Sequence, residues 1–234
     1  MKGKSKIVRR TAPSVLRELK SLADPDAARG MARFGITGGT VYGISVTRLR
    51  ALARRIGRDH ALARRLWASG VHEARILASL VDDPALVTEA QTEAWVRDFD
   101  SWDVCDQVCG NLFDKTPFAY RKALAWSRRR EEFVRRAGFA LMAWLAFHDK
   151  AATDARLRRF LPAITRAATD ERNYVKKAVN WALRQIGKRN RALNREAIRA
   201  ARAIQRLESP AARWIAADAL RELTGEAAQR RLRR

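Results

Sequence analysis

Apolar residues recur at three- and four-residue intervals along almost the whole chain, which is the spacing of one face of an α-helix. In "TRLRALARRIG", for example, Leu49, Leu52, Ala53 and Ile56 share a face, and Gly57 supplies a stop signal. Alternating runs of Val, Ile and Thr, which are typical of strands, are absent. The pattern therefore predicts an all-α protein.

Helix-start signals divide this pattern into about twelve segments joined by short loops. Asp83-Pro84, Thr116-Pro117 and Ser209-Pro210 each place a capping residue before a proline, which is favoured at the first helical position. Further helices are expected near residues 130–148, 153–167, 171–187 and 190–207.

The number of segments exceeds what one compact helical bundle usually holds. Short loops make consecutive helices antiparallel neighbours, and stacked pairs of roughly 40 residues fit a HEAT-type solenoid. We therefore expect a right-handed solenoid of antiparallel helix pairs with a long, basic concave surface. It should form one domain over residues 1–234, with frayed basic ends at about 1–10 and 229–234.

Positive charge is spread along the chain rather than confined to a tail. Lys and Arg number 48 against 25 Asp and Glu, giving a formal net charge of +23. A globular protein this basic usually meets a polyanion, and nucleic acid is the first candidate. Solubility, or a bias toward arginine in the organism, is the alternative explanation, and a protein-binding scaffold fits the charge poorly.

Several classes of site are excluded by the residues present. Gly-rich phosphate loops, nucleophile elbows and zinc-ligand spacings are missing, so no metal or cofactor is expected. Cys105 and Cys109, one helical turn apart, are expected to be core thiols in a reducing compartment. His148 is expected to be a structural histidine on the apolar side of its helix.

Neither a signal peptide nor a membrane span is apparent, because the basic N-terminus is followed by no apolar stretch. The sequence therefore predicts a soluble cytoplasmic monomer, associated with the nucleoid through DNA.

The segment "SWDVCDQVCGNLF", residues 101–113, contains an unusual pair of side chains. It reads as a short helix whose core face comprises Val104, Cys105, Val108, Cys109 and Leu112. Trp102, Asp106 and Phe113 fall outside that face. Trp102 and Asp106 lie one turn apart on the same flank, which places an acid beside an aromatic ring in a strongly basic protein.

The chain has seven tryptophans, and their positions on the helices differ. Trp144 continues the apolar arc of its helix and is expected in the core. Trp181, in "NYVKKAVNWALRQIG", points away from the core arc and toward Lys177 and Arg184. A tryptophan outside a core arc either fills a gap between repeats or faces a ligand.

One kind of DNA chemistry uses a carboxylate beside aromatic rings. Breaking an N-glycosidic bond creates an oxocarbenium-like sugar cation, which a carboxylate stabilises while it orients the attacking water. Aromatic faces add cation–π attraction. A base alkylated at a ring nitrogen is already cationic and leaves without a general acid, which explains why no histidine accompanies Asp106.

"SWDVCD" resembles the Trp-Asp-x-x-Asp element of the AlkD-like DNA alkylation repair family, HEAT-like-repeat glycosylases that remove alkylated purines. "FVRRAGFALMAWLA" and "YVKKAVNWALRQIGKRN" agree, and the similarity extends over roughly residues 30–225. The resemblance implies that Asp106 is the catalytic carboxylate, that Trp102 and Trp181 flank the deoxyribose, and that Arg136 is the functional arginine. It also implies cleavage without base flipping, so that bulky lesions are tolerated.

Two functions fit the sequence. One is a monofunctional DNA glycosylase that excises cationic purines of the 3-methyladenine and 7-methylguanine type from duplex DNA. The other is a non-catalytic helical-repeat module that binds DNA or structured RNA. In the first, Arg136 binds a phosphate and positions it. Candidate phosphate contacts are Arg135, Lys176, Lys177 and Arg184.

Overall fold

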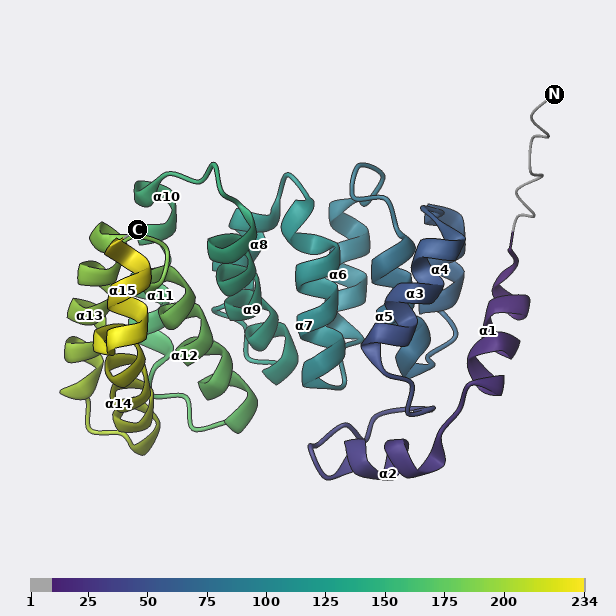
Figure 1. Ribbon diagram of the computed structural model, residues 1–234, viewed down its shortest axis with the longest axis horizontal. Coiled ribbons are helices and arrows are strands. Elements are labelled where there is room, and N and C mark those ends of the chain that lie inside the picture. The colour runs from purple at the N-terminus through teal and green to yellow at the C-terminus, as the bar shows by residue number, and fades with distance from the viewer. Residues whose placement is uncertain (1–9, 234) are drawn as a thin grey trace. The chain divides into compact units, whose positions relative to one another are not determined.

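The computed structural model describes residues 10–233, which form fifteen α-helices and one short 3-10 helix (Figure 1). Within this range no strand is present, and the only β-type pairing is an isolated bridge between Thr40 and Val71. The all-α prediction is confirmed. The predicted number of about twelve helices was too low. One reason is that the segment predicted at 153–167 forms two helices, Asp154–Arg158 and Leu161–Ala167.

The two chain ends expected to be frayed lie only partly within the described residues, so their fraying stays a prediction. Nine residues of the expected frayed N-terminal segment lie outside the described residues, as does Arg234. The preceding residues 229–233, also assigned to a frayed end, belong to helix α15 (Glu226–Arg233). None of the described helices is both long and apolar enough to cross a membrane.

The described residues divide into two compact units, the first ending at Val87 and the second beginning at Thr88. In the first unit α4 packs against α5, and α1 and α3 also contact α5. Its helices are α1 (Ala12–Ser21), α2 (Pro25–Ala32), α3 (Val46–Ile56), α4 (His60–Trp67) and α5 (His72–Val81).

A buried carboxylate fixes the loop before α3 in the first unit. Glu73 is fully buried and accepts hydrogen bonds from the backbone N–H groups of Tyr42, Gly43 and Ile44, at 2.7–3.2 Å. Gly43 has φ of 78°, and a Cβ there would lie 2.3 Å from the Asp24 carbonyl oxygen. The turn therefore requires glycine at this position.

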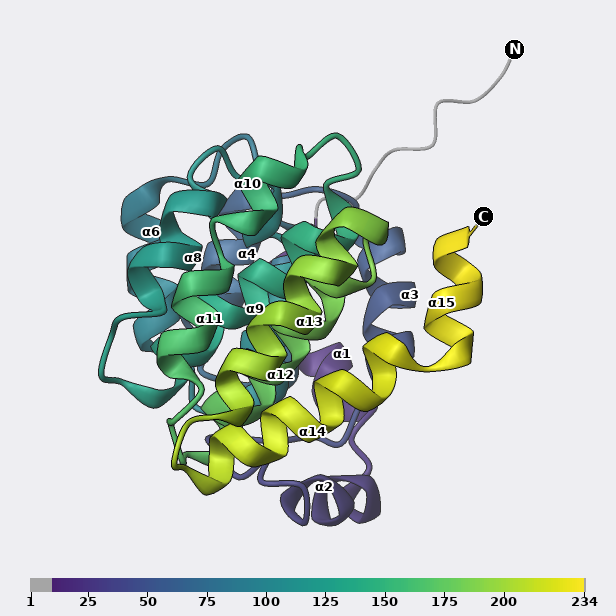
Figure 2. The ribbon, with the colours of Figure 1, turned by 90° about the vertical axis from the view of Figure 1, so that its left-hand side faces the viewer.

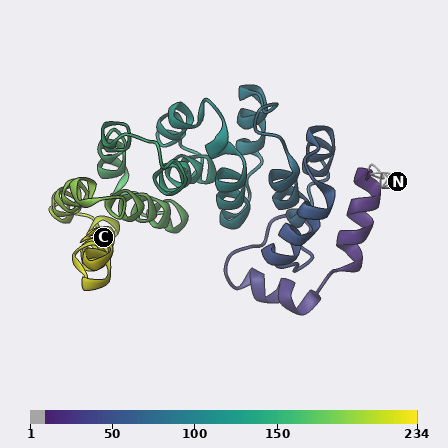
Figure 3. The same cartoon turned by 45° about the horizontal axis from the view of Figure 1, so that its top comes forward.

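The second unit stacks its helices in two layers. One layer runs from α7 through α9 and α12 to α14, each helix packing against the next. Helices α6 and α8 pack on α9, and α11 and α13 pack on α12, forming the other layer. Figure 2 shows α13 lying against α11 and α14, and Figure 3 shows the layers more nearly end-on. The bounds are α6 (Glu89–Arg97), α7 (Trp102–Asn111), η1 (Phe113–Lys115), α8 (Ala119–Trp126), α9 (Glu132–His148), α10 (Asp154–Arg158), α11 (Leu161–Ala167), α12 (Asn173–Gly187), α13 (Arg191–Gln205) and α14 (Pro210–Thr224).

Some predicted helix boundaries are confirmed. Ser209 caps α14 by accepting the backbone N–H of Ala212, and Pro210 is the first helical residue. Gly57 ends α3 with φ of 79°. That one domain with a continuous basic concave surface spans the whole chain stays a prediction.

Two other Pro-based start signals were wrong, because the side chain before each proline closes a turn instead of capping a helix. The Asp83 carboxylate accepts the N–H of Ala85, two residues on. The Thr116 hydroxyl donates to the carbonyl of Phe113. The helices that follow begin later, at Glu89 and Ala119.

Candidate active site

Helix α7 presents the core face that its sequence predicts. The two cysteines are free thiols, as expected. Trp102 and Asp106 are only partly buried, on the flank of this face. The apolar packing of α7 thus fixes the direction in which these two side chains point. The core face consists of Val104, Cys105, Val108, Cys109 and Leu112, all without exposed surface.

Phe113 does not share that flank, and its predicted position outside the core was wrong. It is 1% exposed and packs against the rings of Trp95, Phe99 and Trp126, with centroids 5.8–6.3 Å away. The reason is local: Leu112 leaves the helical conformation with φ of −131° and ψ of −59°. Because the helix has ended at Leu112, the 3.6-residue spacing of α7 cannot be extended to Phe113 to predict which way its ring points.

A bidentate ion pair joins α7 to α9. Arg136 donates from Nε to Asp106 Oδ1 at 2.9 Å and from Nη2 to Asp106 Oδ2 at 2.7 Å. Its Nη1 donates to the carbonyl oxygen of Tyr174, on α12, at 2.6 Å. The side chains of Arg136 and Asp106 are 7% and 15% exposed. Arg136 is therefore not a solvated arginine but a buried clamp that links three helices.

The clamp leaves Asp106 with capacity for a further partner. Each carboxylate oxygen has two lone-pair directions, and Arg136 occupies one on each. Burial raises the pKa of the Asp106 carboxyl above its ordinary value, and the nearby charge of Asp103 adds to this, while Arg136 acts in the opposite direction. Burial also lowers the pKa of the Arg136 guanidinium, but the charge and the hydrogen bonds of Asp106 outweigh it, so that the pKa of Arg136 is raised overall. The pair is thus fixed and partly shielded from water.

Trp144 belongs to this site, and its prediction as a core residue was wrong. It is partly exposed, and its Nε1 donates to the backbone carbonyl of Asp106 at 2.9 Å. Its ring meets that of Trp181 edge-on, with centroids 5.3 Å apart and planes at 83°. A Cβ at Gly110 would lie 2.4 Å from the Trp144 ring. Glycine at 110 therefore lets α9 approach α7 closely enough for this contact.

The structure brings the four predicted catalytic residues into one neighbourhood. The Arg136 guanidinium lies 5.9 Å from the ring centroid of Trp102, which connects Trp102 to the Asp106–Arg136 pair. Trp181 is connected through Trp144. Sequence analysis missed Trp144, although a glycine inside a helix, Gly110, signals a close approach.

Three of the four predicted phosphate contacts have partners within the protein. Arg135 lies 3.2 Å from Asp170, and Arg184 lies 2.5 Å from Glu222. Lys176 Nζ is 5.5 Å from the ring centroid of Trp214, a side chain that is 41% exposed. Lys177 is exposed on α12. Contact of all four with DNA stays a prediction.

His148 lies on the exposed side of α9 rather than in the core. Its Nδ1 is 2.5 Å from Asp114 Oδ2, and its ring stacks on Trp144 with centroids 4.7 Å apart. The prediction of an apolar setting was wrong, although the ring does have a polar partner. In the described part of the chain, no three His, Cys, Asp or Glu side chains are grouped so that they could hold a metal ion.

Comparison with known proteins adds two findings. The family model "DNA alkylation repair enzyme" matches residues 15–223. A solved structure described as "a new family of proteins related to the HEAT-like repeat DNA glycosylases with affinity for branched DNA structures" superimposes with a TM-score of 0.78 at 19% identity. The match covers 95% of this chain and 96% of the other, and shows a shared fold. A search of curated proteins gives no significant match. With the family match covering most of its length, the chain belongs to the DNA alkylation repair enzyme family.

Proposed function

We propose that this protein is a monofunctional DNA glycosylase that removes cationic alkylated purines from duplex DNA. The observation that carries the proposal is the Asp106 carboxylate, held on both oxygens by Arg136 beside the ring of Trp102. An ion pair withdrawn from water contributes little net stability even when both charges are matched, so stability alone does not account for an acid at this place. Its position on the flank, away from the core face of α7, gives it access to a ligand.

The reaction follows from the charge of the substrate. A purine alkylated at N3 or N7 is positively charged. The glycosidic bond between its N9 and the sugar C1′ therefore breaks with the electron pair passing to the base. The neutral base leaves and an oxocarbenium-like sugar remains. The Asp106 carboxylate stabilises this cation and orients a water molecule. The water oxygen bonds to C1′, its proton passes to Asp106 and then to solvent, and an abasic site results.

The neighbouring side chains support Asp106 in different ways. Trp102 and Trp181 offer aromatic faces to the sugar cation, each worth about 0.5–2 kcal/mol of cation–π attraction. Arg136 and Trp144 are positioning residues, since one holds the carboxylate and the other holds the backbone carbonyl of Asp106. No metal or cofactor takes part in this scheme.

The direct test is release of free base from duplex DNA that contains a single 7-methylguanine or 3-methyladenine. We expect release to follow first-order kinetics under enzyme excess and to leave an alkali-labile abasic site. Binding to the duplex without any release of base would contradict the glycosylase proposal. A duplex with a bulky N7 adduct, assayed in parallel, tests tolerance of large lesions.

A non-catalytic DNA-binding module is the second candidate. It is favoured by the description of the similar solved structure, whose affinity is for branched DNA. Structured RNA is a further ligand for such a module. The two candidates differ at Asp106. A binding module uses that carboxylate only to hold Arg136, so Asp106→Asn lowers its stability without weakening its affinity for DNA, whereas a glycosylase also loses base release.

Affinity for DNA is expected to fall steeply with salt. The net charge of +23 is spread along the chain, and each phosphate contact releases bound counterions. For six to ten contacts, we expect the affinity to drop by roughly 10³–10⁵ between 50 and 200 mM salt. Fluorescence anisotropy with undamaged duplex measures this, and a flat salt dependence would count against an electrostatic interface.

Replacing Trp181 should affect the rate of base release more than folding. The ring is partly exposed and contacts Trp144 edge-on, so Trp181→Ala removes a sugar-facing surface from a packed but not fully buried site. We expect single-turnover release to fall about tenfold or more, which corresponds to roughly 1.4 kcal/mol.

Trp126 provides the matched control for this variant. It is 1% exposed and donates from Nε1 to Glu93 at 2.8 Å. Trp126→Ala should therefore lose about 3–5 kcal/mol of unfolding free energy. A loss of that size in Trp181→Ala, measured by denaturant unfolding, would place Trp181 in the core and remove its proposed role.

A further inference from the structure

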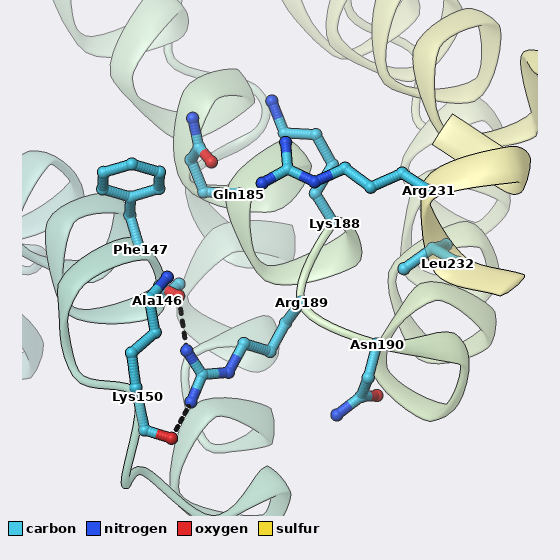
Figure 4. Close-up of a pocket in the computed structure, with 9 residues that line it drawn as sticks. All are labelled: Ala146, Phe147, Lys150, Gln185, Lys188, Arg189, Asn190, Arg231 and Leu232. Atoms are coloured by element: carbon cyan, nitrogen blue, oxygen red, sulfur yellow. Dashed lines mark hydrogen bonds between the residues drawn. The ribbon is translucent and has the colours of Figure 1, made fainter. Parts of the chain in front are cut away.

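A cavity of about 500 Å³ lies in the second unit, where the C-terminal ends of α9 and α12 meet α15 (Figure 4). It has no role in the scheme above. The volume falls within the range of pockets that hold a small molecule or one nucleotide. Its lining consists of Ala146, Phe147, Lys150, Gln185, Lys188, Arg189, Asn190, Arg231 and Leu232.

The charges around the cavity select an anion. Its lining includes four cationic side chains and no carboxylate. Arg189 lines the cavity, and its guanidinium is held there, since its Nη2 donates to the Lys150 carbonyl at 2.5 Å and its Nη1 to the Ala146 carbonyl at 3.5 Å. Lys188 lies 2.7 Å from Glu222, and Arg231 is exposed. Positive charge thus exceeds negative charge at this place.

An exposed aromatic ring faces the same space. Phe147 is 44% exposed, an unusual position for a large apolar side chain, and Lys150 Nζ lies 4.8 Å from its ring centroid. Figure 4 shows the ring on one side of the cavity, with Lys188 and Arg231 across from it and Gln185 between them. A ring opposite cations matches a nucleotide, since bases stack on aromatic faces while phosphates bind cations.

The cavity adjoins the candidate active site along two helices. On α9 the ring of Phe147 is 6.2 Å from that of Trp144, which contacts both Asp106 and Trp181. On α12 Gln185 lies one turn after Trp181. With a helical rise of about 1.5 Å per residue, this turn spans roughly 6 Å, close to the spacing of neighbouring nucleotides along a strand.

We propose that this cavity is a subsite for one unpaired nucleotide of DNA. Its base stacks on Phe147, the Gln185 amide reaches the base edge, and its phosphate binds Lys188 and Arg231. The subsite takes a nucleotide that is already unpaired in the DNA and lies next to the one bound at Asp106, so it requires no base flipping at Asp106. The proposal rests on binding of DNA by this chain and does not depend on release of a base.

The test compares two undamaged, fluorescein-labelled duplexes of the same sequence, one fully paired and one with a single bulged nucleotide. The bulged nucleotide is already unpaired, so the cost of extrusion is small. We expect the wild-type protein to bind the bulged duplex at least about fivefold more tightly, the lower range of stacking on an aromatic ring. Phe147→Ala should reduce this preference to less than about twofold, whereas Phe147→Tyr, which keeps the ring, should retain it.

Arg231 has a matched control on the same helix. Arg230 is exposed and pairs with Glu226, and it does not line the cavity. Arg231→Ala should weaken binding of the bulged duplex selectively, while Arg230→Ala should leave the preference unchanged. Thermal unfolding checks that each variant is folded.

Three results would overturn the proposal. They are equal affinity of the wild-type protein for both duplexes, a preference that survives Phe147→Ala, or equal weakening of both duplexes by Arg231→Ala, which would indicate an ordinary backbone contact. The test also separates this proposal from the glycosylase proposal, because the preference for bulged DNA is measured on undamaged duplexes, from which no base is released.

Discussion

Asp106→Asn should lower the rate of alkylpurine release by about two orders of magnitude or more, the usual effect of removing a group that stabilises charge in the transition state. The substitution preserves size, replaces one of the two oxygens that accept from Arg136 by an NH2 group, and removes the negative charge that we propose stabilises the sugar cation. Each tenfold loss corresponds to about 1.4 kcal/mol of transition-state stabilisation. Binding to undamaged duplex should hold steady or improve slightly, because a negative charge near phosphates is lost. The measurement is single-turnover base release, with duplex binding assayed beside it.

The ion pair complicates this variant and determines its controls. The substitution would leave Arg136 buried without its charge partner, which typically costs about 3–5 kcal/mol of stability, so the rates must be compared at a temperature where both proteins are folded. Asp103→Asn is the matched control, since it makes the same charge change in the first turn of the same helix. It should spare the chemistry and cost at most about 1 kcal/mol through the helix dipole. Wild-type-like release by Asp106→Asn would contradict the mechanism and leave the DNA-binding module as the better explanation.

Helical periodicity predicted which face of a helix is buried, because the apolar side chains within that one helix mark the face that packs into the core. The five core residues of α7 are buried as their spacing requires, and Asp106 lies beside them on the flank. The same argument placed Trp181 outside the core arc of α12, where it is partly exposed. Such predictions need only the geometry of a single helix.

Contacts between helices could not be predicted in this way. Asp106 and Arg136 are 30 residues apart, and periodicity states which side of a helix a residue occupies but not which side chain it meets. Arg136 was predicted to bind a phosphate, and its contacts with Asp106 and the Tyr174 carbonyl were not foreseen. Trp144 was assigned to the core because the helix-wide arc says nothing about how closely α7 and α9 approach at Gly110.

Capping residues before proline were reliable only where no competing turn was available. Ser209 caps α14, while Asp83 and Thr116 use the same polar groups to close turns. Short polar side chains satisfy backbone groups equally well in both settings. The choice depends on the packing of the residues that follow, which the local pattern does not contain.

Arg136→Lys should show whether the clamp, rather than the charge alone, is needed. Lysine keeps the positive charge but has a single ammonium group, which cannot reproduce the planar fork that binds both Asp106 oxygens while also reaching the Tyr174 carbonyl. We expect single-turnover base release to fall roughly 10- to 100-fold, because small misplacements of a reacting group are costly. The melting temperature should also fall, since α7, α9 and α12 lose a shared anchor. Arg135→Lys is the matched control, because Arg135 is the adjacent residue and pairs with Asp170 instead.

The pH profile distinguishes a positioning role from a purely structural one. Burial raises the pKa of Asp106 and the Arg136 guanidinium opposes that shift, so a poorer partner lets the pKa rise further. The proposed reaction requires the carboxylate form of Asp106. A higher pKa leaves less carboxylate at a given acidic pH, and the fall in activity on acidification should therefore begin at a higher pH in Arg136→Lys than in the wild-type protein. Base loss from enzyme-free DNA is subtracted at each pH. An acid limb that superimposes on that of the wild-type protein, at whatever absolute rate, would mean that Arg136 stabilises the fold without tuning Asp106.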